Sequence, residues 1–284
     1  MRGYVILLVP RFHSLTNLEH NITPSHLELL SNILRRCDTK AQKLLARNLM
    51  LSASNLGQSS ATFSLIESAL RTGALQEYQP PLYRLGLLAK NHDPHAMALL
   101  GKVLIAQSKD KEALTWLRKA TRPPTGNLEF DGAGEALVNE GRLLQKQNDM
   151  NGAEEVFRRA ALELDEPSGY FYLSQLQTPG SPQREEYLLK AASSGIIEAC
   201  HNLGALELAK EEKKQEVKPG SKIDYRMAVE WFTLAAHDGF GLSMLNLATI
   251  YKSMGDEGKG TFWLEAAENI PDVFEQAQAV RSSW

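Results

Sequence analysis

Two short histidine-containing stretches are the most chemically suggestive residues of this chain. Asn91–His95 reads NHDPH and offers two imidazoles and a carboxylate, which are donor types that bind zinc. No further cysteine or histidine cluster follows nearby to complete four ligands. Asp93 followed by Pro94 is instead typical of a helix N-cap and the first helical residue. We therefore predict a helix start here rather than a metal site.

The second stretch, Cys200-His201, places a thiol beside an imidazole. No acidic residue stands at a spacing known to complete a nucleophilic site, so we expect Cys200 to pack in the core and His201 to face solvent. GLSML around Ser243 lacks the second glycine of a nucleophile elbow. DGAGEA around Gly134 is not a G-x-G-x-x-G loop. The sequence therefore predicts no catalytic site and no cofactor.

The residues leave one alternative open, namely an enzyme or a dedicated subunit of one. Its activity would lie in the N-terminal region, which contains His13, His20, His26 and Cys37 without a recognisable spacing. Nothing in these residues names a substrate, so this stays the second hypothesis behind a binding protein.

The composition is that of an ordinary folded protein and argues against several classes of partner. The chain has 284 residues, of which 43% are hydrophobic and 23% charged, with a net charge of −3. Because phosphate binders need a concentrated basic face, this charge gives no reason to expect nucleic acid. Two cysteines cannot form a disulfide framework, which favours a reducing, intracellular compartment.

The longest apolar run near the start is YVILLV, Tyr4–Val9. It is far shorter than the ~20 residues that a membrane span needs, so we expect no membrane span. Arg2 and Arg11 precede the first acidic residue, Glu19, which leaves a mitochondrial presequence as an alternative to a cytoplasmic protein. We prefer to interpret the run as a first buried strand or helix.

Small and apolar residues recur along the chain at fixed intervals. Ala235 is preceded by Trp231 at four residues and by Ala228 at seven, and Gly239 follows it after four. Similar offsets recur around five more alanines: Ala69, Ala120, Ala160, Ala191 and Ala267. Such repetition predicts stacked structural repeats.

A second small residue lies upstream in several copies. Gly101, Gly141 and Ala248 precede their alanines by 19 residues, whereas Gly204 precedes Ala235 by 31. This copy therefore carries an insertion, which we place in the charged stretch KEEKKQEVKPGSK, residues 210–222. Because the stretch also contains Pro-Gly, we expect it to be a loop.

Helix packing explains the spacing. Ala228, Trp231 and Ala235 stand at i, i+3 and i+7, so they form one stripe on a helix. Small side chains let a neighbouring helix approach to about 8 Å, and the tryptophan fills the space where the pair diverges. A glycine four residues after the alanine ends the helix in the left-handed conformation. Each copy is thus predicted to be a two-helix hairpin. In the copy around Ala235, Trp231 is predicted to lie in the core.

A resemblance to Sel-1-like repeats, the longer relatives of tetratricopeptide repeats, is carried by GIIEACHNLGALELA and MAVEWFTLAAHDGFGLSMLNLATIY. The copy ALVNEGRLLQKQNDMNGAEEVFRRAALELDEP is similar to a tetratricopeptide repeat. The resemblance implies an all-α fold, a right-handed α-solenoid of antiparallel helix pairs. It also implies a non-enzymatic protein-interaction scaffold, adaptor or assembly factor. We expect a helical region with degenerate repeats over 1–80 and the repeat array, with a capping helix, over 81–284.

Three asparagines occupy the same place in their repeats, two residues before the small residue. They are Asn139, Asn202 and Asn246, while the first well-matched copy has Leu99 there. In the repeats that the chain resembles, the first helices line the concave surface. An amide there can donate to and accept from one peptide unit of an extended ligand. The competing interpretation is that these asparagines order a neighbouring helix or face water.

Positive charge follows the first of these asparagines. Arg142 comes three residues after Asn139 and Lys146 one turn later. We therefore predict a concave face that binds an extended, slightly acidic segment of a partner protein. Its candidate residues are Asn139, Arg142, Lys146, Asn202 and Asn246.

Overall fold

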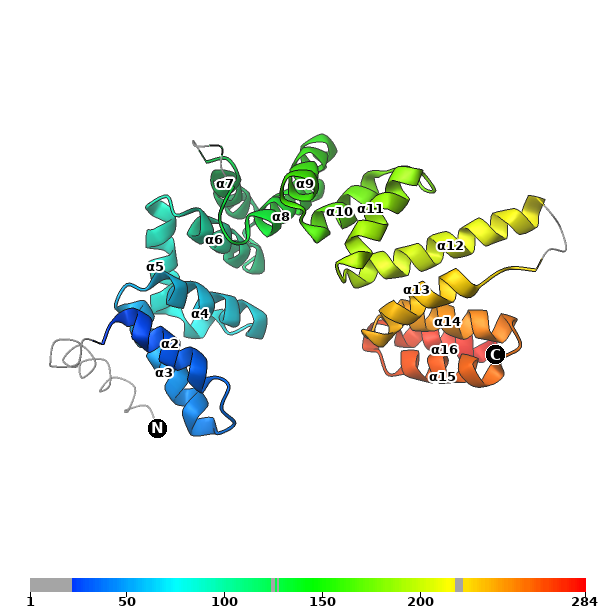
Figure 1. Cartoon of the computed structure of the whole chain (residues 1–284), viewed down its shortest axis with the longest axis horizontal. Coiled ribbons are helices and arrows are strands. Elements are labelled where there is room, and N and C mark those ends of the chain that lie inside the picture. Colours follow the sequence, from blue (N-terminus) through cyan, green and yellow to red (C-terminus); the bar gives the residue numbers. More distant parts are fainter. Residues whose placement is uncertain (1–21, 124–125, 127, 218–221) are drawn as a thin grey trace. The chain divides into compact units, whose positions relative to one another are not determined.

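The computed structural model describes residues 22–123, 126, 128–217 and 222–284 (Figure 1). In this part of the chain every regular element is helical, with fifteen α-helices, two short 3-10 turns and no strand. The run Tyr4–Val9, His13, His20 and Pro219-Gly220 lie outside the described residues.

The chain divides into two compact units, Met1–Leu143 and Leu144–Trp284. The first contains α2 (Pro24–Leu34), α3 (Lys40–Asn55), α4 (Ser59–Thr72), η1 (Leu75–Glu77), α5 (Gln79–Lys90), α6 (Pro94–Ala106) and α7 (Asp110–Thr121). Helix α8 (Ala133–Lys146) contains the boundary. The second contains α9 (Met150–Leu164), α10 (Pro167–Leu176), α11 (Pro182–Ser193), α12 (Ile197–Val217), α13 (Arg226–His237), α14 (Gly241–Ser253), α15 (Glu257–Glu268), η2 (Pro271–Val273) and α16 (Phe274–Ser282).

Within each unit the helices pack mainly against their neighbours in sequence. Helix α2 lies on α3, α6 on α7, α12 on α13 and α14 on α15. Packing mainly between elements that are neighbours along the chain is characteristic of a repeat array. The predicted all-α solenoid of antiparallel helix pairs is confirmed. The predicted division into degenerate repeats over 1–80 and a repeat array over 81–284 rests on how well the sequence matches the repeat pattern, and it stays a prediction.

The helix ends follow the sequence closely. The carboxylate of Asp93 accepts a hydrogen bond from the backbone N–H of Ala96 at 2.9 Å, and α6 begins with the following proline. Gly73, Gly195 and Gly239 take φ values of 68°, 87° and 87°, in the left-handed region where glycine is unstrained. The predicted cap and the three predicted helix stops are confirmed.

The core residue of the repeated stripe is not the one that the sequence indicated. Trp231 is only half-buried, whereas its neighbour Phe232 is 0% exposed. Around Ala120 and Ala267, as here, the residue four before the alanine is only partly buried, whereas around Ala69, Ala160 and Ala191 it is buried as well. In all six copies the residue three before the repeated alanine is fully buried. These residues are Ile66, Leu117, Phe157, Leu188, Phe232 and Leu264.

The small residues on the preceding helices explain why this residue is the buried one. A Cβ on Gly204 would lie 2.7 Å from Cδ1 of Phe232, and one on Gly101 would lie 2.7 Å from Cδ2 of Leu117. The inward side chain therefore packs directly on the backbone of the facing helix, which needs a residue without a side chain there. Placing Trp231 in the core was wrong because Phe232 is the residue that meets Gly204 across the hairpin, and the pattern favoured the larger of the two neighbours.

The charged insertion is largely helical rather than a loop. Helix α12 continues to Val217, and ion pairs one turn apart run along it, at 2.8 Å between Lys210 and Glu207 and at 2.5 Å between Lys214 and Glu211. Lysine and glutamate have high helix propensity, and such pairs add to it. The loop prediction is therefore wrong for residues 210–217.

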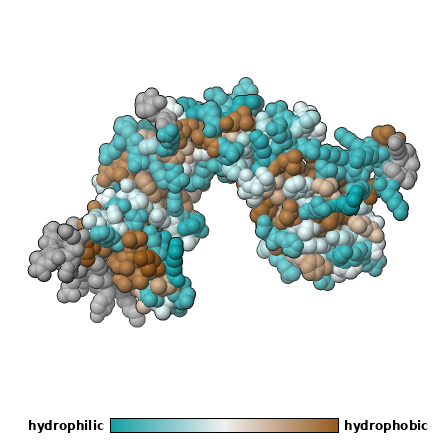
Figure 2. Space-filling model, in the orientation of Figure 1, coloured by the Kyte–Doolittle hydropathy of each residue, from teal (hydrophilic) through white to brown (hydrophobic). Residues whose placement is uncertain are grey.

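Exposed apolar side chains gather on the first two described helices. Leu29, Leu30 and Ile33 on α2, with Leu44 and Leu45 on α3, are each at least 46% exposed. Figure 2 shows apolar surface over this part of the first unit. None of these five side chains belongs to the core cluster in which Leu27, Leu49 and Met50 pack.

Candidate protein-binding site

Asn202 lies in a groove on one face of α12. The groove has a volume of ≈ 330 Å³, and the α12 residues that line it recur every three or four positions. They are Asn202, Ala205, Leu206, Ala209, Lys210 and Lys213. Residues at this spacing share one side of a helix, so α12 forms a continuous wall with an amide at one end and a cation at the other.

The turn between α10 and α11 forms the opposite wall. Pro179 and Gly180 lie in this turn, and Gly180 has φ 77°, which a larger residue would adopt only with strain. The hydroxyl of Ser181 caps α11 by accepting a hydrogen bond from the N–H of Arg184 at 3.3 Å. The cap holds the first turn of α11 so that Arg184 lines the groove.

The groove carries more positive than negative charge. Lys210 donates to Glu185 at 2.7 Å and to Glu207 at 2.8 Å. Burial alone would lower the pKa of Lys210, but these two hydrogen bonds and charges outweigh it and raise the pKa. Arg184 and Lys213 have no carboxylate partner among the described residues. Two cations are thus available to a ligand in the groove.

All three predicted asparagines are half-buried. Within the described part of the chain, none of their amide groups forms a hydrogen bond. Each amide therefore keeps its donors and acceptor for a ligand or for water. The competing interpretation, that they order a neighbouring helix by hydrogen bonding, finds no contact to support it in these residues.

A partly buried hydrogen bond joins the two helices that carry Asn202 and Asn246. Nδ1 of His201 on α12 lies 2.9 Å from the hydroxyl of Ser243 on α14, whose side chain is 0% exposed. His201 directly precedes Asn202, and Ser243 stands about one turn before Asn246. This hydrogen bond links α12 to α14 near the positions of both asparagines along the chain.

His201 is itself half-buried, which corrects the prediction that it faces solvent. Its ring lies 5.4 Å from the ring of Phe232 and 4.8 Å from that of Phe240. Burial lowers the pKa of His201, because the charged imidazolium is poorly solvated there. No pattern in the sequence indicates this contact, since Ser243 stands 42 residues away.

Asn139 belongs to the first unit and is oriented by a buried carboxylate next to it. Glu140 is 0% exposed and accepts hydrogen bonds from Thr121 and Arg122, each at 2.7 Å. These bonds fix the rotation of α8 about its axis. Arg142 and Lys146, both exposed, follow Asn139 at i+3 and i+7 on the same helix. That the five predicted residues form one binding face stays a prediction.

The described residues that suggested catalysis have structural contacts. Cys200 is 7% exposed, and burial raises the pKa of its thiol, so the reactive thiolate is disfavoured. The imidazole of His26 accepts a hydrogen bond from the N–H of Thr23 and caps α2. The described residues contain no group of three histidine, cysteine or acidic side chains placed to hold a metal ion.

Arg184 and Lys213 are not among the site residues predicted from the sequence. Lys213 stands eleven residues after Asn202, three turns along the same helix stripe. Lys213 can be assigned to this groove only if residues 210–217 are helical, whereas the sequence predicted a loop there. Arg184 has no such signal, since it reaches the groove through the turn between α10 and α11.

Stacked antiparallel helix pairs define an all-α repeat protein of the Sel1-like and tetratricopeptide-like fold. The sequence matches no protein-family model and no curated protein. In the described residues, no helix is both long enough and apolar enough to cross a membrane.

Several solved structures share this fold, including the following three. One is PilF of Pseudomonas aeruginosa, with a TM-score of 0.60 and 19% identity over 80% of this chain and 97% of that one. A Sel1 repeat protein from Oxalobacter formigenes has a TM-score of 0.51 and 16% identity over 99% and 91%. A protective antigen of uropathogenic Escherichia coli with an SLR fold has a TM-score of 0.57 and 18% identity over 86% of this chain. This chain spans about half, 53%, of that antigen, and at these identities the likeness is one of fold.

Proposed function

We propose that this chain is a protein-interaction scaffold that holds an extended, acidic segment of a partner along its inner helices. The observation that carries the proposal is the groove beside Asn202. There an amide with no hydrogen-bond partner among the described residues shares one face of α12 with Ala205 and Ala209, and Arg184 and Lys213 line the same groove. The fold supports it, because repeat arrays present extended surfaces for binding.

Each part of the groove suits a feature of such a segment. The amide of Asn202 can pair with the N–H and C=O of one peptide unit, whatever its side chain. Ala205 and Ala209 leave room for a main chain to approach. Arg184 can grip a carboxylate with two parallel hydrogen bonds, while Lys213 acts as a point charge. Asn139, Arg142, Lys146 and Asn246 are the further residues that we propose contact the partner.

The proposal is tested by affinity purification from native extract followed by mass spectrometry. The bait carrying Arg184→Glu and Lys213→Glu should lose the partner that the unaltered chain captures, because charge reversal repels an acidic segment. The matched control carries Lys40→Glu and Lys43→Glu, the same change in net charge at exposed residues of α3. Equal capture by all three baits would move the binding site away from this groove.

A further inference from the structure

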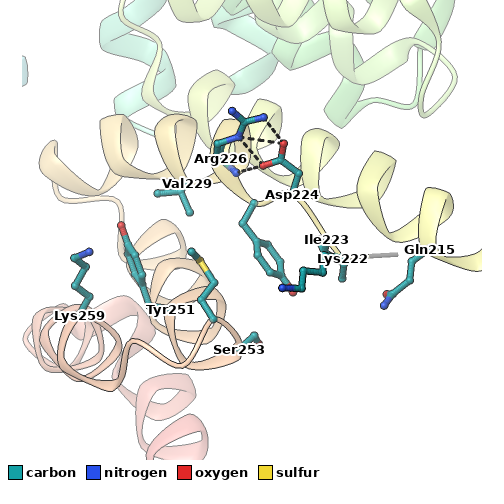
Figure 3. Close-up of a pocket in the computed structure, with 11 residues that line it drawn as sticks. Gln215, Lys222, Ile223, Asp224, Arg226, Val229, Tyr251, Ser253 and Lys259 are labelled. Atoms are coloured by element: carbon teal, nitrogen blue, oxygen red, sulfur yellow. Dashed lines mark hydrogen bonds and ion pairs between the residues drawn. The ribbon is translucent and has the colours of Figure 1, made fainter. Parts of the chain in front are cut away.

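A second groove lies against the other side of α12 (Figure 3). It has a volume of ≈ 860 Å³ and involves the insertion that distinguishes this repeat from the others. Its walls are the last turn of α12, the segment 222–225, the first turns of α13, the end of α14 and the start of α15. The proposed function makes no use of this insertion.

Helix α12 separates the two grooves. Lys213 lines the groove beside Asn202, whereas Gln215 lines the second groove. Two residues advance a helix by about 200°, so these side chains point to nearly opposite sides of α12. A segment bound in one groove therefore leaves the other accessible.

The floor of the second groove is apolar and partly exposed. Tyr225, Val229 and Tyr251 are partly buried and pack on the core of the second unit. Met254, at the end of α14, remains 55% exposed. Methionine is flexible and adapts to differently shaped apolar partners. The groove also falls within the about 300–1,000 Å³ typical of ligand pockets.

The rim of the groove is positively charged. Among the described residues that line the groove, Asp224 is the one carboxylate, and it accepts hydrogen bonds of 2.9 and 2.6 Å from Arg226. Lys259 is anchored by Asp256 at 3.0 Å and lies 5.2 Å above the ring centre of Tyr251. Lys222 is exposed and has no carboxylate partner among the described residues.

We infer that this groove docks a partner segment with one large apolar side chain flanked by carboxylates. The apolar side chain lies against Val229, Tyr251 and Met254, and the carboxylates face Lys222 and Lys259. The charge of the rim selects against a basic segment, and the floor selects against one that is acidic throughout.

Methyl NMR of the full chain with labelled methionine tests the inference, because Met254 reports from inside the groove. One probe is a synthetic peptide of a phenylalanine flanked by two aspartates on each side. The second probe replaces the aspartates with lysines, and the third replaces the phenylalanine with glycine. We expect a saturable shift of the Met254 methyl signal with the first probe only.

Two matched charge reversals complete the experiment. Lys222→Glu should weaken binding of the first probe about threefold or more, as loss of an exposed rim charge does. Lys40→Glu makes the same change at an exposed residue of α3 that lines neither groove, and it should leave the Met254 response unchanged. This experiment contains no partner of the Asn202 groove. A negative result here therefore does not test the proposed function, and failure of the proposed function does not test this inference.

Four outcomes would overturn the inference. The first is no saturable shift, and the second is an equal shift with the lysine or the glycine probe. The third is equal weakening by both charge reversals, which indicates non-specific attraction. The fourth is a Met254 signal that moves with protein concentration alone, which would assign the groove to a second copy of this chain.

Discussion

Phe232 and Trp231 are neighbours in sequence, but only one of them holds two helices together. Phe232 is fully buried against the backbone of Gly204, while Trp231 is half-exposed. We expect Phe232→Ala to lower the free energy of unfolding by about 3–5 kcal/mol through the cavity that it leaves. Trp231→Ala should cost about 1–2 kcal/mol, since less apolar area leaves the core. Chemical denaturation measures both, and the opposite ranking would contradict this register of α13 against α12.

Gly204 gives a complementary prediction from the other side of the contact. A methyl group there would lie 2.7 Å from the Phe232 ring, in a tightly packed core that has no room for it. We expect Gly204→Ala to destabilise the chain by about 1–3 kcal/mol although alanine is the better helix former. Gly86 on α5, with no atom within 4 Å of such a methyl group, is the control site, and Gly86→Ala should stabilise slightly. Stabilisation by both substitutions would contradict this packing.

His201 makes stability depend on pH. Burial lowers its pKa below 6.5, so the unfolded chain binds a proton more readily than the folded one. Its contribution to stability is therefore complete above pH 6.5 and is lost as the pH falls toward the lowered pKa. His201→Gln removes the titration and keeps a group that can bond to Ser243. Between about pH 7 and pH 5, the unaltered chain should lose more stability in urea unfolding than this variant. Parallel losses would contradict the assignment.

At the scale of elements, α12 differs from every other first helix because it continues through the insertion. Its last turns are exposed and lie outside the packed pair. Shortening residues 210–222 to the common spacing should leave the melting temperature within a few degrees, because surface ion pairs contribute little. The same deletion should abolish the Met254 response, since it removes a wall of the second groove. A large loss of stability would show that these turns belong to the core.

Most of the helical architecture could be predicted from the sequence because small residues and caps act locally. Asp93, Gly195 and Gly239 mark helix ends through their own backbone geometry. The choice between Trp231 and Phe232 could not be made, because it depends on which side chain meets Gly204 across the hairpin. The helix over 210–217 was missed because its charge and the Pro-Gly that follows favour a loop.

Less of the candidate site could be predicted. The position of Asn202 followed from the repeat, and the structure adds that its amide is unpaired among the described residues. Arg184 could not be predicted as a groove residue, because it comes from another hairpin and its position depends on the turn at Gly180. The bond between His201 and Ser243 likewise depends on packing between helices far apart in sequence.

At the scale of the whole molecule, contacts within each unit run mainly between neighbouring helices. Damage to one hairpin should therefore stay near it. We expect Phe232→Ala to reduce amide hydrogen-exchange protection in α12–α15 more than in α3–α7. Leu117→Ala, the equivalent substitution in the first unit, should give the reverse pattern. Uniform loss of protection in both variants would contradict two units of largely local stability.

The central claim is that the amide of Asn202 on α12, which is unpaired among the described residues, holds a main-chain segment of a partner protein. The measurement that tests it most directly is the affinity of the captured partner for the unaltered chain and for Asn202→Ala, with melting temperatures recorded alongside. We predict an unchanged melting temperature and a several-fold weaker affinity, as one or two lost hydrogen bonds would give. The variant in which Asn139, Asn202 and Asn246 are all alanine should bind more weakly still. Unchanged binding by this triple variant, still folded, would contradict the claim and place the site elsewhere on the chain.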